Sequence, residues 1–164
     1  MEVRPKIKIE RTPTDNILEI MGWVALVGLW ILIFLNYSNL PDTIPTHFNG
    51  AGKVDNYGGK ATLFMLPIIA TVAYIGLTVL NNYPHIFNYP TKLTAENALR
   101  QYTSATRMIR YLKFVIVLVF SLIVFMTLRT AAGESEGLGA WFLPFTLGLI
   151  FIPLGIFVIQ SFRK

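Results

Sequence analysis

Four apolar segments, each close to the length that crosses a lipid bilayer, constrain this chain more than any other feature. A spanning helix needs about 20 predominantly apolar residues. Such stretches occupy residues 17–35, 63–80, 114–128 and 141–159, and the third reaches this length when residues 109–113 are included. Lipid offers no hydrogen-bond partners to a backbone, so each stretch must be helical. The sequence predicts an all-α integral membrane protein with four transmembrane helices in a single membrane domain, residues 1–164.

The composition agrees with a chain that resides in a bilayer. Of the 164 residues, 54% are hydrophobic and only 14% are charged, whereas soluble domains average about 25% charged residues. There is no cysteine, which excludes disulfides and thiolate metal sites. No small-x-small pattern follows the first segment before Asn36, so we expect an uncleaved helix there. We expect lipid as a partner, no nucleic acid and no cofactor.

The distribution of Lys and Arg predicts the orientation. Eleven of the 14 cationic residues fall in the N-terminal tail (residues 1–16), the connection 81–113 and the C-terminal tail (residues 160–164). The other three, Lys53, Lys60 and Arg129, fall in the connections 36–62 and 129–140. Cytoplasmic loops carry the positive excess. Both termini are therefore expected in the cytoplasm, and the connections 36–62 and 129–140 outside.

The connection 81–113 divides into a proline-containing strap and an amphipathic helix. Asn-Tyr-Pro occurs twice, at residues 82–84 and 88–90, and favours extended backbone. Thr94 is placed to cap a following helix, which either continues into the third span or lies on the membrane surface. Arg100, Arg107 and Arg110 share its polar side. They either contact anionic lipid or a cytoplasmic regulator, or form a solvated face that sets topology.

The spans themselves look chemically quiet. None carries an ionisable residue near its midpoint, and Glu19 stands close to the start of the first. Intramembrane ionisable residues commonly mark proton relays and ion paths. The sequence therefore argues against a proton-coupled transporter.

The outer connection 36–62 is far longer than the few residues that a reversal of the chain requires. Pro41 and Pro45 favour extended backbone, residues 43–48 alternate in polarity, and Asn49–Gly52 is a strong turn signal. We expect a short β-hairpin that caps the outer ends of the helices.

The hairpin also holds the candidate site. Its candidate binding residues are Asp42, His47, Asn49, Asp55 and Lys60, and the residues expected to shape it are Pro41, Pro45, Phe48, Gly52, Tyr57 and Gly58. Alternatively, Asn49 and Asp55 bond to the backbone in Asx-type turns and His47 packs against Phe48 or Tyr57. His47 and Asp55 are weak metal-ligand candidates, because this face has only one histidine.

The hairpin residues also resemble a known family. The pattern is Leu40-Pro41-Asp42-x-Ile44-Pro45-x-His47-Phe48-Asn49-x-x-Gly52-x-x-Asp55-x-Tyr57-Gly58-x-Lys60. It resembles the domain of unknown function DUF1648, which also forms the N-terminal part of the SdpI-family immunity proteins. Gly59 departs from the Ser or other small residue usual there. The resemblance implies a bacterial cytoplasmic (inner) membrane protein. For the SdpI family it implies defence against a toxin peptide and sequestration of a repressor, but we expect this chain to lack that family's further C-terminal spans.

We therefore expect a non-enzymatic binding or regulatory module, immunity-like in its role, whose outer loop recognises an extracellular peptide or another ligand. Two alternatives stay open: a metal-assisted membrane enzyme at His47, Asn49 and Asp55, and a small transporter or an accessory subunit of one. The glycine-bearing helix faces can pair within one chain or between chains, so the pattern sets no oligomeric state.

Overall fold

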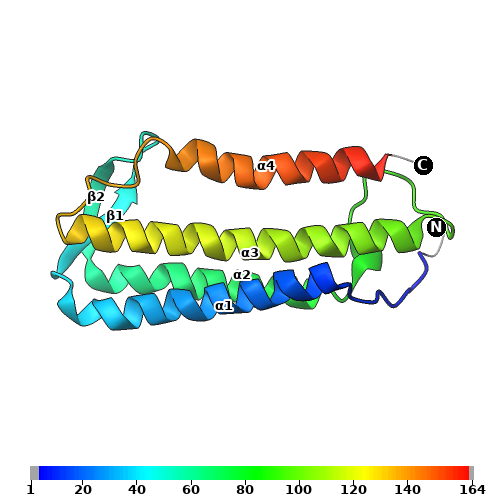
Figure 1. Ribbon diagram of the computed structural model, residues 1–164, viewed down its shortest axis with the longest axis horizontal. Helices are drawn as coiled ribbons and strands as arrows, with labels where there is room; N and C mark the ends of the chain where they lie inside the picture. The colour runs from blue at the N-terminus through cyan, green and yellow to red at the C-terminus, as the bar shows by residue number, and fades with distance from the viewer. Residues whose placement is uncertain (1–3, 163–164) are drawn as a thin grey trace.

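Four long helices run side by side in the computed structural model, which describes residues 4–162 (Figure 1). Their bounds are α1 (Pro13–Asn36), α2 (Met65–Leu80), α3 (Ala98–Ala131) and α4 (Phe142–Ser161). The short turn η1 (Tyr37–Asn39) follows α1, and η2 (Lys60–Phe64) leads directly into α2. Within the described residues, these four helices are long and apolar enough to cross a membrane. The predicted four-helix membrane architecture is confirmed.

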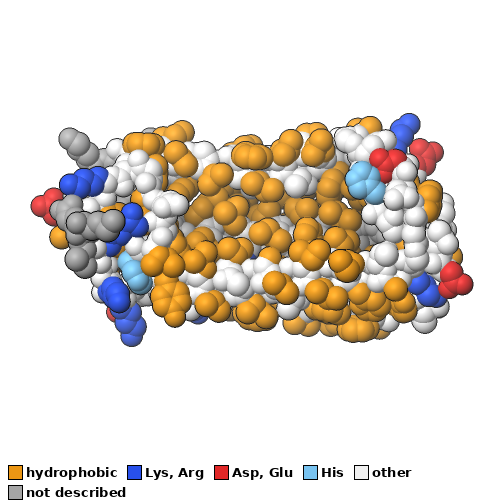
Figure 2. All heavy atoms as spheres, turned by 180° about the vertical axis from the view of Figure 1, so that it is seen from behind, with side chains coloured by type: hydrophobic (Ala, Val, Ile, Leu, Met, Phe, Trp, Pro, Cys, Tyr) orange, Lys and Arg blue, Asp and Glu red, His pale blue; other side chains and the backbone are white. Residues whose placement is uncertain are grey.

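Helices α1, α2 and α3 form the core, whereas α4 packs mainly on α3. The buried core residues include Leu29 and Ile33 of α1, Tyr74 of α2, and Val117 and Val124 of α3. Only Phe142 and Ser161, at the two ends of α4, are buried. Hydrophobic side chains cover the middle of the molecule and charged ones gather at its two ends (Figure 2). This pattern suits a bundle whose flanks face lipid.

The predicted amphipathic helix and third span are one continuous helix, α3. Its 34 residues extend about 50 Å, which exceeds the roughly 30 Å of a bilayer's hydrocarbon core. Thr94 caps the turn before α3 instead of α3 itself: its Oγ1 accepts from Asn97 N at 3.3 Å, and its N donates to Asn97 Oδ1 at 2.9 Å. The strap contains the short turn η3 (Pro84–Ile86).

The connection between α1 and α2 folds into the predicted hairpin. Strands β1 (Thr43–Phe48) and β2 (Val54–Gly59) pair antiparallel, with Thr43 opposite Gly59 and Phe48 opposite Val54. The register shifts between Pro45 and His47, where proline cannot donate to the ladder. Ile44 is 1% exposed and joins the helical core, so β1 is fixed to the bundle rather than free above it.

The hairpin lies at one end of the bundle, and the segment before α1 and the end of α4 lie at the other (Figure 1). We call these the hairpin end and the terminal end. The tails predicted for residues 1–16 and 160–164 are described only from Arg4 and up to Phe162, so Arg163 and Lys164 lie outside the described residues.

We expect a reporter at the C-terminus and one in the connection 132–141 to report opposite sides of the membrane. A C-terminal green fluorescent protein should fluoresce, since the charge distribution predicts a cytoplasmic location for that end. Alkaline phosphatase fused after Ser135 should be active. Active phosphatase at the C-terminus would reverse the predicted orientation.

Candidate functional site

The hairpin presents one exposed pair of titratable side chains, His47 on β1 and Asp55 on β2. His47 Nδ1 lies 2.5 Å from Asp55 Oδ1, and the side chains are 67% and 40% exposed. Asp55 therefore pairs with His47 on the opposite strand. The residue that makes the Asx-type turn is Asn49. Exposed ion pairs contribute at most about 1 kcal/mol to stability. The pair is thus available for recognition at little cost to the fold.

Asn49 and Gly52 shape the tip of the hairpin. Asn49 Oδ1 accepts from the amides of Ala51 (3.0 Å) and Lys53 (3.1 Å), which confirms the predicted Asx turn. Gly52 has φ +73°, and its carbonyl accepts from Leu138 N (2.7 Å) and Gly139 N (3.3 Å). The two connections at this end are therefore joined, which the sequence patterns did not reveal. The only hint was the glycine spacing at residues 137 and 139.

Asp42 and Lys60 close the base of the hairpin. Lys60 N donates to Asp42 O (2.9 Å), and Lys60 Nζ lies 3.3 Å from Asp42 Oδ1 and donates to Leu40 O at 3.2 Å. The Lys60 ammonium also lies 5.5 Å from the centre of the Tyr37 ring. These two candidate binding residues thus hold the loop against the end of α1. Of the other predicted shaping residues, Tyr57 is 60% exposed.

A cleft of about 460 Å³ opens below β1, between α2, α3 and α4. We call it the hairpin cleft. Its wall is mainly apolar and includes Ile44, Phe48, Leu66, Ile123, Leu138 and Phe142. His47 and Thr127 are among the polar residues that line it. The face shown in Figure 2 is hollowed along its middle and lined by hydrophobic side chains. The cleft lies beside α3, on which α4 mainly packs.

The metal ligands of the hairpin are too few for a typical site. Among residues 4–162 no three His, Cys, Asp or Glu side chains are grouped so that they could hold a metal ion. His47 and Asp55 supply two ligands, whereas protein metal sites commonly use three or four.

A second cluster of polar side chains lies inside the bundle near the terminal end. It consists of Asp15 and Glu19 of α1 with Arg107, Arg110 and Lys113 of α3. Arg107 Nε lies 3.0 Å from Asp15 Oδ1, and Arg110 Nε lies 3.2 Å from Glu19 Oε1. Lys113 Nζ donates to Glu19 Oε2 at 2.7 Å. We call this group the ion cluster.

The ion cluster also reaches α2 and is shielded from solvent except at Arg107, whose side chain is 41% exposed. Lys113 is 0% and Asp15 1% exposed. Lys113 Nζ donates to Thr78 Oγ1 at 2.8 Å and lies 4.4 Å from the centre of the Tyr74 ring. One ammonium group therefore contacts all three core helices, and removal of its partner would leave a buried, uncompensated charge.

The ion cluster was missed in the sequence because its two halves were assigned to different environments. Asp15 and Glu19 stand four residues apart, and Arg107, Arg110 and Lys113 three apart, so each set shares one helix face. That spacing is a usable signal. Arg107 and Arg110 point into this cluster. The contact with lipid or a regulator that was expected of them stays a prediction.

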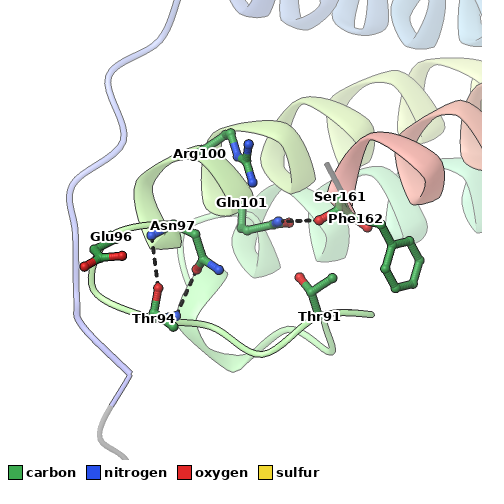
Figure 3. Close-up of a pocket in the computed structure, with 8 residues that line it drawn as sticks. All are labelled: Thr91, Thr94, Glu96, Asn97, Arg100, Gln101, Ser161 and Phe162. Atoms are coloured by element: carbon green, nitrogen blue, oxygen red, sulfur yellow. Dashed lines mark hydrogen bonds between the residues drawn. The ribbon is translucent and has the colours of Figure 1, made fainter. Parts of the chain in front are cut away.

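Arg100 lies elsewhere, beside the C-terminus of α4. It lines a space with Thr91, Thr94, Glu96, Asn97, Gln101, Ser161 and Phe162 (Figure 3). The neighbouring Gln101 Nε2 donates to Ser161 O at 2.8 Å. This hydrogen bond ties the end of α4 to α3.

Comparison with known proteins gives a family but no activity. The family described as Domain of unknown function (DUF1648) matches residues 24–71, which run from α1 through the hairpin into α2. A protein named "Uncharacterized protein" from Archaeoglobus fulgidus is 32% identical over 160 residues, covering 89% of this chain and 86% of its own. No solved structure matches. The similarity to the archaeal protein therefore extends well beyond the family segment.

Gly52→Ala should destabilise the hairpin end, since a Cβ there would lie 2.3 Å from Gly139 O at a positive φ. Backbone strain of this kind costs about 1–3 kcal/mol. Gly50→Ala is the matched control, because a Cβ at Gly50 meets nothing within 4 Å. Thermal unfolding in detergent should show a clear loss for the first variant alone. Equal melting temperatures would contradict the close junction.

Glu19→Gln should destabilise the protein by about 3–5 kcal/mol, because it leaves Lys113 buried beside a neutral amide. The double variant Glu19→Gln/Lys113→Met should recover much of that loss, as it removes the stranded charge. Glu10→Gln, an exposed carboxylate outside the cluster, is the control. Thermal unfolding in one detergent measures all three. A Glu19→Gln variant as stable as Glu10→Gln would refute the structural role.

Proposed function

The chain belongs to the DUF1648 family of unknown function, and on that premise we propose that its hairpin end binds an amphipathic peptide without catalysing a reaction. The single observation that carries this proposal is the hairpin cleft, an apolar space of about 460 Å³ bordered by the hairpin. Binding sites are typically concave, mostly apolar and equipped with a few polar groups. The cleft has this composition, with His47 at the hairpin and Thr127 on α3.

The construction of the hairpin end favours recognition by a preformed surface. Lys60 contacts Asp42 at the base of the hairpin, and the carbonyl of Gly52 joins its tip to the connection before α4. A loop held in place before binding loses less conformational freedom when its ligand arrives. Apolar side chains of a peptide would enter the cleft, and the exposed His47–Asp55 pair would meet its polar groups.

The same geometry gives less support to the two alternative functions. A metal-assisted enzyme would have His47 and Asp55 as two ligands, with Asn49 Oδ1 already engaged by two backbone amides. A transporter needs a polar path through the bundle. The ion cluster lies towards one end, and beyond it the core is apolar, with Leu29, Ile33 and Val124 buried.

In the cell, binding of an amphipathic peptide would correspond to an immunity-like role. The outer hairpin would capture an envelope-active peptide before it disrupts the bilayer, in a protein whose termini face the cytoplasm. The resemblance of the loop to the SdpI immunity proteins supports this role, as does the apolar cleft. A bacterial cytoplasmic membrane is the location that the resemblance suggests.

Ile123→Trp should abolish protection, because Ile123 lines the cleft and a larger side chain would fill it. Phe125→Trp is the matched control on the same helix, since Phe125 is 45% exposed and outside the cleft. Cells that express each variant at equal level would be challenged with a panel of envelope-active peptides. Compared with cells that lack the protein, cells with the wild type or Phe125→Trp should show a shift of about tenfold or more in the inhibitory concentration of at least one peptide.

Loss of protection in both variants, or in neither, would overturn the assignment to the cleft. Protection by none of the proteins would overturn the immunity-like role. Metal analysis of purified wild type and His47→Ala addresses the enzyme alternative. Stoichiometric metal that is lost in His47→Ala would favour that alternative over ours.

A further inference from the structure

A separate pocket of about 230 Å³ lies at the terminal end, far from the hairpin cleft. We call it the terminal pocket. It is bounded by the N-terminal segment through Lys8 and Arg11, by Asn81 and Asn82 after α2, and by Thr106 and Arg110 of α3. Three elements distant in the sequence therefore form it.

The N-terminal segment is held over this pocket by specific contacts. Arg4 Nη1 donates to the carbonyls of His85 (3.1 Å) and Phe87 (2.7 Å) in the strap. Tyr89 Oη donates to Pro84 O at 2.9 Å, and Pro84 lines the pocket. Burial raises the pKa of the Tyr89 phenol, so it remains a donor at neutral pH. The strap and the N-terminal segment are thus joined and form one wall of the pocket.

The lining of the terminal pocket is cationic without an acidic residue. Lys8 and Arg11 are exposed, and Arg110 is buried. Behind Arg110 the ion cluster pairs three cations with two carboxylates, which leaves one positive charge uncompensated. The Arg107 side chain is 41% exposed and the Arg110 side chain 6%, and a charge in a region of low dielectric attracts an anion more strongly than the same charge in water.

A buried polar atom at the pocket, Asn81 Oδ1, also lacks a partner within the described residues. Arg110 is 5% exposed, and its Nε and Nη1 face Glu19 Oε1 (3.2 Å) and Asp15 Oδ1 (3.6 Å) in ion pairs without a hydrogen bond of good geometry within the described residues. Asn81 is 8% exposed; its Nδ2 donates to Thr106 O, but its Oδ1 accepts no hydrogen bond from any residue between Arg4 and Phe162. Such groups normally find a partner. A hydroxyl of a bound ligand would satisfy Asn81 Oδ1, and Lys8 and Arg11 at the mouth would face its anionic group.

We propose that the terminal pocket binds a phosphate ester that carries an adjacent hydroxyl, such as a phosphoglycerol group. The phosphate would approach Arg110, with Lys8 and Arg11 at the mouth, and the hydroxyl would donate to Asn81. The pocket's volume is below that of drug-sized sites, about 300–1,000 Å³, and suits a small headgroup. Basic pockets between transmembrane helices are a known setting for anionic headgroups. The same chemistry occurs in a lipid headgroup and in free glycerol phosphate.

The test measures the thermal stabilisation of the full chain in detergent by short-chain ligands. Dioctanoyl phosphatidylglycerol is compared with dioctanoyl phosphatidylcholine, and glycerol 1-phosphate serves as the soluble probe. Arg110→Gln would disturb the ion cluster, so the informative variants are Lys8→Gln and Arg11→Gln at the exposed mouth. Lys6→Gln is the matched control, because it removes one charge from the same exposed segment outside the pocket.

We expect phosphatidylglycerol to stabilise the wild type more than phosphatidylcholine does. Lys8→Gln and Arg11→Gln should each weaken its apparent affinity about fivefold, the factor that corresponds to ~1 kcal/mol per cation near a membrane surface, and Lys6→Gln should not. Stabilisation by glycerol phosphate alone would support a soluble ligand for the same site. Equal effects of all three variants, or no preference for either phosphate ligand over phosphatidylcholine, would overturn the proposal.

Discussion

The position of the helices depends on the buried salt bridge between Glu19 and Lys113. It joins α1 to α3, and the hydrogen bond from Lys113 to Thr78 adds α2. In lipid, helices gain little from hydrophobic association, so packing and polar contacts select their partners. A buried charge pair tolerates little displacement, because separation exposes each ion to an apolar surrounding. The cluster therefore specifies which faces of α1, α2 and α3 meet, and the apolar core towards the hairpin follows from that register.

The family segment and the ion cluster occupy different parts of the chain. Residues 24–71 include the hairpin and Lys60 at its base. They exclude Asp15 and Glu19, which precede them, and Lys113, which follows them. The hairpin is thus the part of this protein that the family definition describes. Most of the ion cluster and of the terminal pocket lies outside this segment. The hairpin cleft and the terminal pocket therefore lie at opposite ends of the bundle.

The sequence predicted the helices and the hairpin because both depend on local patterns. Apolar length identifies a membrane helix, and Pro41, Pro45 and the Asn49–Gly52 turn specify the hairpin. Asn49 behaves as expected because an Asx turn is also local. The pairing of Glu19 with Lys113 spans 94 residues, and no local rule connects them. The junction of Gly52 with Leu138 was hidden for the same reason. Contacts between elements require the packing of helices to be known.

The separation of α4 from α2 makes the hairpin cleft, and it has an identifiable cause within α4. Pro153 lies inside this helix and has no amide hydrogen to donate to Leu149 O. Tyr111 Oη on α3 donates to that carbonyl at 2.9 Å, which satisfies it without water. Together with the bond from Gln101 to Ser161, this contact holds α4 on α3 at its middle and its end. Both of these anchors belong to α3, and neither joins α4 to α2. The space between them remains open beneath the hairpin, and its opening depends on polar contacts in an otherwise apolar interface.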